Sequence, residues 1–410
     1  MAASASSSSK SKPNQNTHER LVRFQGHHNL RARLVLSILT GRPVVITGIR
    51  AKSTSPGLRE YEAGFLRLLE KITNGSKIEI GYTGTSLSFK PGTLTGGHVQ
   101  HDCGTSREVG YYLEWIIVLA PFAKKELSLT LKGITTGEHD LGVDLIRTVS
   151  LPILSLFLPS ASSLASSLEL RITARGAAPL GGGCVYFRCP LLPNAASSGA
   201  GNMGGMLRTL DFTNAGRIKR IRGVASATRV SPQMANRMVE AARGILNRYI
   251  PDLYLFADVY RGEEAGKSPG FGLSLVASSN TGALHCSECI SKPGQTPEEV
   301  AIEAARMLLT EIATRGCVPR THQSMALLLM ALGPEDVGKA RFGQLTPQAI
   351  VTLRDLRQFM GITFQLKSQR HELARTEADE DEEEEAAAAF VEEIVVSCVG
   401  GAIRGARKVG

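Results

Sequence analysis

The chain has 410 residues, of which 42% are hydrophobic and 21% are charged, and its net charge is +9. This length suits either two or three domains or one large domain with an insertion. The positive charge predicts a polyanionic partner such as nucleic acid, while the aromatic content of 5% argues against an extended base-stacking platform. No apolar run approaches the ~18 residues that a membrane helix needs, so no membrane partner is expected.

The termini and the cysteines indicate an intracellular protein. Residues 1–19 are rich in serine and lack an apolar secretory segment, which predicts a disordered tail. Seven cysteines without regular spacing suit a reducing compartment. Cys286 and Cys289 form a single CxxC pair, and one pair supplies too few ligands for a structural metal. We therefore expect no metal.

Taken in chain order, the periodicity predicts three copies of a unit with two helices and four strands, an α/β (α+β) fold. The first copy has strands over 21–26, 43–51, 77–82 and 86–92 and helices over 29–39 and 58–72. The second has helices over 109–119 and 141–156 and strands over 127–135 and 167–176. The third has helices over 296–313 and 347–359 and strands over 324–332 and 362–367.

A smaller inserted β-β-α-β domain is predicted between the second and third copies. It contains a glycine-rich loop over 194–205, strands over 207–212, 216–231 and 252–260, and a helix over 232–249. The expected boundaries are 20–186 for repeats one and two, 187–268 for the insertion, 269–368 for repeat three and 369–410 for a C-terminal extension. Within that extension, the acidic run over 377–385 is either a disordered arm or a weak helix, and it serves either as a solvated spacer or as a basic-partner mimic. Residues 390–410 form either a strand or a helix.

Two basic clusters are candidates for binding an anion or RNA. Arg217, Lys219, Arg220 and Arg222 lie in one predicted strand, where charge on both faces suggests either a protected sheet edge or phosphate contacts. The other cluster surrounds the first helix and the strand after it, and consists of Arg31, Arg33, Arg42, Arg50 and Lys52. The glycine triplet at 181–183 has two readings, since such a segment either cradles a phosphate or packs a tight crossover.

Three motifs carry a resemblance to a known family. They are GFLRLLEKI, the preceding RAKSTSPGLREYEA that begins at Arg50, and FKPGTLTGG that begins at Phe89. In this order and spacing they are similar to the RNA 3′-terminal phosphate cyclases, and most closely to the eukaryotic cyclase-like branch, from about residue 21 to 366. The resemblance implies three α/β repeats with their sheets inside and their helices outside, and an inserted domain at the same point.

The resemblance also shows departures from the cyclase pattern. The histidine that carries the covalent nucleotide in the family falls on Gln348, whose amide is not a nucleophile. A family glutamine falls on Glu114, where a carboxylate repels phosphate. His27 and His28 replace glycines that let the backbone approach the nucleotide. Arg31 and Arg50 match family arginines, so anion binding without catalysis is expected, with no cofactor.

The resemblance implies a non-catalytic factor for ribosome biogenesis in the nucleus and nucleolus. Such a factor acts in the small-subunit processome, where it supports early pre-rRNA cleavage and scaffolds a ribosome-assembly GTPase and pre-rRNA. Two enzymatic alternatives stay open. One is a pre-rRNA endonuclease that uses His27, Arg31 and Glu114 as base, cation and acid. The other is a residual RNA 3′-phosphate cyclase.

Overall fold

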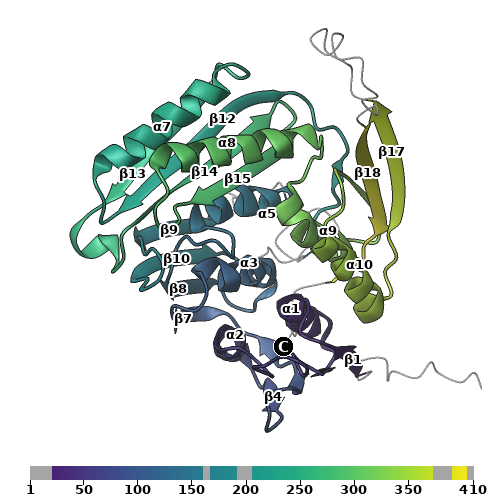
Figure 1. Cartoon of the computed structure of the whole chain (residues 1–410). Helices are drawn as coiled ribbons and strands as arrows, with labels where there is room; N and C mark the ends of the chain where they lie inside the picture. Colours follow the sequence, from purple (N-terminus) through teal and green to yellow (C-terminus); the bar gives the residue numbers. More distant parts are fainter. Residues whose placement is uncertain (1–20, 160–166, 192–205, 373–389, 404–410) are drawn as a thin grey trace, which may run out of the picture.

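The computed structural model describes residues 21–159, 167–191, 206–372 and 390–403, and it is a mixed α/β protein (Figure 1). The predicted serine-rich tail, the glycine-rich loop and the acidic run lie outside the described residues. None of the helices that the structure describes has both the length and the apolar character to cross a bilayer.

The first repeat forms a four-stranded sheet with two helices. Its elements are β1 (Val22–Gln25), α1 (Leu30–Thr40), β2 (Val44–Thr47), α2 (Glu60–Ile72), β4 (Lys77–Ile80) and β5 (Leu87–Lys90). The strand order is β1-β2-β5-β4, with β1 and β2 parallel and the other pairs antiparallel. Val44 and Ile46 are buried on alternate positions of β2, as a half-buried strand requires. Two short strands, β3 (Thr73–Asn74) and β6 (Thr93–Leu94), pair separately.

The second repeat has the same order and strand directions. Its elements are β7 (Gly97–Asp102), α3 (Val109–Leu119), η1 (Ala120–Phe122), β8 (Leu127–Gly133), α4 (Val143–Leu145), η2 (Ile146–Ser150), α5 (Leu151–Phe157), β9 (Glu169–Ala174) and β10 (Gly183–Cys189). The sheet runs β7-β8-β10-β9, again with a parallel first pair. The segment α4-η2-α5 is one helical stretch interrupted by the π-helical turn η2.

The third repeat is interrupted by the insertion. Its elements are β11 (Asp211–Phe212), η4 (Arg320–His322), α9 (Gln323–Leu332), β16 (Val337–Phe342), α10 (Pro347–Met360), β17 (Gln365–Glu372) and β18 (Phe390–Val399). The strand order is β11-β16-β18-β17. The prediction of a strand over 324–332 is wrong, because this segment is the fully buried helix α9. Its residues are apolar on every side, so periodicity could not distinguish a buried helix from a buried strand.

The C-terminal extension is also corrected. Strand β18 pairs with both β16 and β17, so residues expected to lie outside the repeats supply an interior strand of the third sheet.

The inserted domain is larger than predicted. It comprises β12 (Ile218–Thr228), α7 (Pro232–Leu246), β13 (Leu253–Tyr260), η3 (Gly262–Ala265), β14 (Gly270–Ser279), β15 (Leu284–Ile290) and α8 (Pro297–Ala313). The sheet order is β13-β12-β14-β15. Helices α7 and α8 pack on this sheet and form with it a hydrophobic core separate from the main core of the repeats, which we call the second core. The boundary at 268 is therefore wrong, and α8 belongs to the insertion and not to repeat three. Strand β11 pairs with β16 and therefore belongs to the third sheet. The insertion lies between β11 and α9 in the chain.

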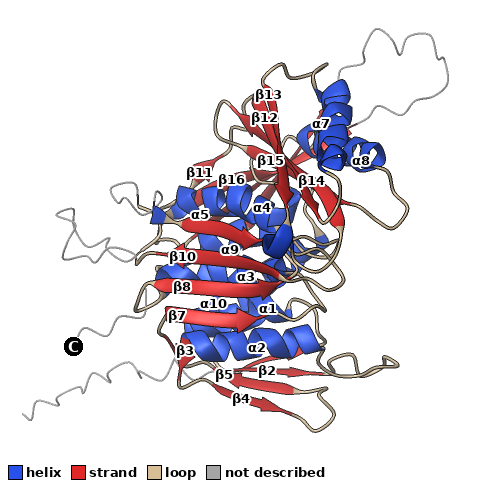
Figure 2. Ribbon diagram, turned by 90° about the vertical axis from the view of Figure 1, so that its left-hand side faces the viewer, coloured by secondary structure: helices blue, strands red, loops and turns tan. Residues whose placement is uncertain are grey.

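The layers of the three repeats are the reverse of the expectation from the resemblance. Helices α3 and α9 are buried almost all round, with only Glu114 less than fully buried in α3, and the three sheets lie outside them. In Figure 2 the sheet formed by β7, β8, β10 and β9 lies in front of α3, α9 and α10. A central helix must be apolar on every face, as the segments VGYYLEWIIVL and QSMALLLMAL are.

The glycine triplet packs backbone against backbone. Gly181 has φ +62°, and a Cβ there would lie 3.1 Å from the carbonyl carbon of Gly133. Gly266 has φ +61°, and its Cβ would lie 2.6 Å from the carbonyl oxygens of Arg175 and Gly181. The N–H of Lys267 donates to the Gly181 carbonyl at 2.9 Å. The triplet therefore joins repeat two to the inserted domain by tight packing, which is the second of its two readings.

Candidate functional site

Gln348, the position that the resemblance assigns to the family nucleophile, lies where the N-terminal ends of three helices meet. Gln348 is the second residue of α10, and its amide Nε2 donates to Oδ1 of Asn29 at 2.7 Å. Asn29 precedes α1, and Arg31 on α1 donates to the carbonyl of Tyr111 in the first turn of α3 at 2.5 Å. We call this site the helix-terminus cluster. Its members are Asn29, Gln348, the arginines Arg31, Arg33, Arg50 and Arg107, and their acidic partners Glu62, Glu114, Asp140 and Asp355. It contains Arg31, Arg50 and Gln348, three of the positions that the resemblance singles out.

Arg31 is held by the second repeat. Its guanidinium forms an ion pair with Glu114 at 3.0 Å and lies 4.1 Å from the centre of the Tyr111 ring. Burial raises the pKa of Glu114, and the neighbouring Arg31 acts in the opposite direction. The carboxylate that replaces a family glutamine thus neutralises Arg31, which the resemblance assigns to anion binding.

Arg50 is held within the first repeat. Its two terminal nitrogens donate to the two carboxylate oxygens of Glu62, each at 2.7 Å, and this hydrogen bonding raises the pKa of Arg50. Glu62 is buried and also accepts the N–H of Arg59 at 2.8 Å, which caps α2. Lys52 lies exposed on the same loop.

Further ion pairs around these arginines were missed by the sequence analysis. Arg107 donates to both oxygens of Asp140 at 2.7 Å, and its own pKa is raised by that hydrogen bond. Arg33 donates to Asp355 at 3.1 Å, and Asp355 also accepts from Asn29 at 2.8 Å. Asp355 follows Gln348 by seven residues on α10, so helical spacing was a signal for it. The sequence gives no such signal for Asp140.

Arg42 has a structural role. It donates to the carbonyl of Phe359 at 2.5 Å and so binds the C-terminal end of α10.

Within the cluster, the arginines form ion pairs with carboxylates of the same chain. Arg31, Arg33, Arg50 and Arg107 each have an acidic partner at 3.1 Å or less. An incoming phosphate would have to displace a partly buried carboxylate and leave it without a counter-ion, which is costly.

Of the three residues of the endonuclease hypothesis, Arg31 and Glu114 form an ion pair at 3.0 Å. Burial lowers the pKa of His27, and the charges of Arg50, His28 and Arg59 act in the same direction, while Glu62 acts against them. The structure therefore pairs Arg31 with Glu114, while the ring of His27 stacks on the ring of His28 at 4.5 Å between centroids.

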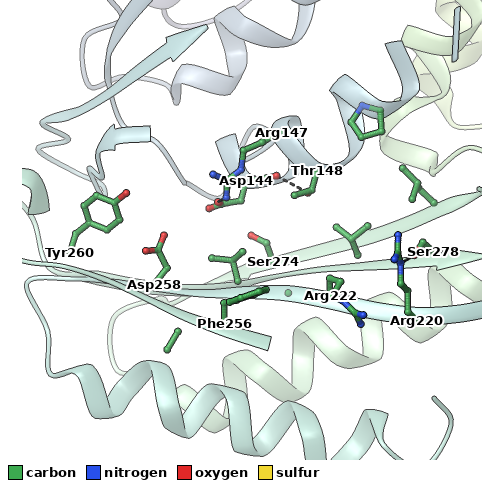
Figure 3. A pocket seen from close by; sticks show the side chains of 16 residues that line it. Asp144, Arg147, Thr148, Arg220, Arg222, Phe256, Asp258, Tyr260, Ser274 and Ser278 are labelled. Atoms are coloured by element: carbon green, nitrogen blue, oxygen red, sulfur yellow. Dashed lines mark hydrogen bonds and ion pairs between the residues drawn. The ribbon is translucent and has the colours of Figure 1, made fainter. Parts of the chain in front are cut away.

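The second basic cluster lies elsewhere, on the inserted domain. Strand β12 lies between β13 and β14, so a sheet edge is the wrong interpretation for Ile221–Thr228. The preceding Ile218–Arg220 pair only with β14, and Arg217 and Lys219 there are exposed. Arg220 and Arg222 lie on one face of the sheet and line a cleft of about 730 Å³ opposite η2 and α5 (Figure 3).

A buried arginine ties the two walls of this cleft together. Arg175, which is 1% exposed, donates to both oxygens of Asp144 at 2.7 and 2.9 Å. It also donates twice to Asp258 on β13, at 2.9 and 2.7 Å. Arg147 and Tyr260 complete this end of the cleft. Sequence reasoning missed these residues because they come from separate segments that only the tertiary structure brings together.

Neither cysteine pairing nor metal binding is seen in the described residues. Cys286 packs in the main core, and Cys289 packs in the core of the inserted domain, on the opposite face of β15. Across the described part of the chain, no group of three or more histidine, cysteine or acidic side chains is placed to hold a metal.

The triple β-α-β-α-β-β scaffold, with an insertion in its third unit, defines the cyclase-type class of α/β protein. The family model described as RNA 3′-terminal phosphate cyclase matches residues 22–366. The chain belongs to this family.

Several relatives are similar over most of their length. The RNA 3′-terminal phosphate cyclase-like protein of Homo sapiens is 47% identical over 358 residues, which are 86% of this chain and 92% of the human protein. The probable cyclase-like protein of Dictyostelium discoideum is 43% identical over 86% of this chain and 94% of its own length. The rRNA processing protein rcl1 of Schizosaccharomyces pombe is 45% identical over 85% and 92%.

Proposed function

We propose that this chain is a non-catalytic factor in the maturation of small-subunit ribosomal RNA. It acts in the nucleolus as part of the small-subunit processome, where it supports early pre-rRNA cleavage by holding pre-rRNA and a ribosome-assembly GTPase. Support for the process comes from the similarity to the rRNA processing protein of Schizosaccharomyces pombe. The net charge of +9 suits an RNA partner.

One observation supports the non-catalytic part of the proposal. The nucleophile position holds Gln348, whose amide is hydrogen-bonded to Asn29, and the arginines around it are paired with carboxylates of the same chain. Covalent nucleotide transfer needs a nucleophile and cations that stabilise the phosphates. The helix-terminus cluster supplies neither.

Nucleotide labelling tests this point directly. Purified protein incubated with radiolabelled ATP or GTP is expected to carry no bound label after denaturing electrophoresis. The variant Gln348→His is expected to stay unlabelled too, because the paired arginines persist when the nucleophile is restored. A labelled band in the unchanged protein that disappears in Gln348→Ala would contradict the proposal, as would cyclisation of a 3′-phosphorylated oligonucleotide.

The role in RNA maturation needs a cellular test. Depletion of the protein is expected to accumulate uncleaved small-subunit precursor, visible on a northern blot, and the Gln348→Ala variant is expected to restore cleavage. Failure of depletion to change the precursor pattern would contradict the role.

The endonuclease alternative is distinguished by purified components. Cleavage of a precursor fragment by the protein alone, lost in His27→Ala or Glu114→Gln, would favour that alternative. We expect no cleavage, because Arg31 is neutralised by Glu114.

A further inference from the structure

The inserted domain has an open sheet face that no helix of its own covers. Helices α7 and α8 pack on one side of the sheet with the buried residues of the second core. The other side faces α4, η2 and α5 of the second repeat across the cleft of about 730 Å³ (Figure 3). Residues of β12, β13 and β14 line it, together with Arg147 and Thr148 on the π-helical turn η2. Such turns occur often at functional sites.

Two aromatic rings stand exposed on this face. Tyr254 and Phe256 on β13 are each 51% exposed, and their ring centres are 4.4 Å apart at an interplanar angle of 79°. They are two residues apart on one strand, so both project to the same side of the sheet, and Phe256 lines the cleft. A chain with 5% aromatic residues therefore exposes an adjacent pair of rings at one place.

Arginines lie next to the rings. In the register of the sheet Arg222 is opposite Tyr254, so the two side chains come from neighbouring strands roughly 4.8 Å apart. Arg220 lies two residues earlier on the same face and donates from Nε to Ser278 at 3.0 Å. Arg217, which precedes β12, and Lys219, the second residue of that strand, are exposed and add positive charge outside the cleft lining.

The acids at the cleft are already bound by arginine. Asp144 and Asp258 both accept from the buried Arg175, and Arg147 also pairs with Asp144 at 3.3 Å. Asp252 pairs with Arg222 at 2.8 Å, but both side chains are well exposed, so a phosphate can compete with this contact. Within the described residues Arg220 makes no ion pair.

We infer that this face binds single-stranded RNA, with unpaired bases stacked on Tyr254 and Phe256 and phosphates held by Arg220 and Arg222. Exposed rings accept any unpaired base, and planar guanidinium groups donate to phosphate oxygens. In the lining, the Ser278 hydroxyl accepts from Arg220 and can donate its proton to a base edge, while the hydroxyls of Ser274 and Thr148 donate to Glu288 and to the Asp144 carbonyl and can only accept. A paired duplex hides its base faces from such rings, so single strands are the chemical class that fits. The inference rests on the proposed function for the identity of the RNA as ribosomal precursor.

Fluorescence anisotropy with the full-length protein tests this inference. A labelled single-stranded RNA of mixed sequence is titrated against the unchanged protein and the Tyr254→Ala/Phe256→Ala double variant. We expect the double variant to bind about tenfold or more weakly, since each lost stack contributes substantially. The matched control is Tyr249→Ala, which removes a ring that is 63% exposed in the same domain but outside the cleft lining, and it is expected to bind normally.

The salt dependence of RNA binding tests the charged contacts. Arg220→Gln/Arg222→Gln is expected to lower the slope of log affinity against log salt by about 1–2, as loss of two phosphate contacts requires. Arg243→Gln, on the far face of the domain in α7, is the control and is expected to leave the slope unchanged. Thermal unfolding of each variant shows whether it is folded.

Three results would overturn the inference. The first is that the aromatic double variant binds RNA as tightly as the unchanged protein. The second is that the unchanged protein binds duplex and single-stranded RNA equally well. The third is that the face binds an acidic peptide and no RNA. The last result would assign the face to a protein partner. None of these results alters nucleotide labelling or precursor accumulation, so failure here is distinguishable from failure of the proposed function.

Discussion

The helix-terminus cluster and the cleft of the inserted domain both contain several arginines, but the arginines have different partners. In the cluster, Arg31, Arg50 and Arg107 are each bound by a carboxylate at 3.0 Å or less. In the cleft, the buried Arg175 binds the acids while Arg220 and Arg222 remain at the surface beside exposed rings. The comparison shows that arginines paired with partly or fully buried carboxylates serve the stability of the fold, whereas arginines at the surface remain accessible to a ligand.

The largest expected effect is at Arg175. We expect Arg175→Met to lower the free energy of unfolding by about 3–5 kcal/mol, because the buried Asp144 loses its bidentate partner. Urea denaturation followed by circular dichroism measures this change. Arg188→Met, which breaks an exposed pair with Glu126, is the control and is expected to have no measurable effect. Similar stability of both variants would mean that Arg175 does not join the two walls of the cleft.

Arg50 tests whether the cluster is structural. Arg50→Ala is expected to destabilise the protein by about 2–3 kcal/mol, because Glu62 is buried and keeps only its contact with the Arg59 backbone. Lys52→Ala, in the same exposed loop, is the comparison and is expected to be neutral. If Arg50 instead served an external phosphate, its removal would leave stability unchanged in the absence of ligand and lower phosphate affinity.

A smaller effect, dependent on pH, is expected at the boundary between repeat two and the inserted domain. Burial raises the pKa of Glu288 to about 7, although it accepts hydrogen bonds from Ser274 and from the N–H of Gly142. A carboxyl group whose pKa is higher in the folded state stabilises the fold when protonated, and this stabilisation is lost as pH rises from about 4.5 towards 7.

Glu288→Gln removes that titration. The free energy of unfolding of the variant minus that of the unchanged protein is expected to rise by about 2 kcal/mol between pH 5 and pH 8. Denaturant titrations at several pH values measure it. A difference that stays constant across this range would show that Glu288 titrates normally in the folded protein.

Local signals predicted most of the helices. The segments that became α1, α2, α7 and α10 combine apolar periodicity with a proline or glycine near an end, and the structure places helices there. Assignment of elements to sheets was less successful. Strands β14 and β15 and helix α8 complete the inserted domain, which the sequence did not predict. The reason is that β14 pairs with β12 through a long-range contact that local pattern does not encode.

The residues of the candidate sites also differ in how far the sequence predicted them. Of the residues that the resemblance assigns to one site, Arg31 and Glu114 form an ion pair, and Gln348 contacts Asn29, two residues before Arg31. Asp140 and the Tyr254 and Phe256 pair were not predicted. Asp140 meets Arg107 from 33 residues away, and the rings form a surface only because α4-η2-α5 leaves the facing sheet open.

The glycine contact between repeat two and the inserted domain has a mechanical consequence for the cleft. At Gly266 there is no space for even one methyl carbon beside the carbonyl oxygens of Arg175 and Gly181. The two walls are therefore held together at the same end where Arg175 spans them, and these contacts oppose a hinge motion of the domain at that end. A strand of RNA would meet a binding surface that already has its final width, and little ordering of the protein would be needed on association.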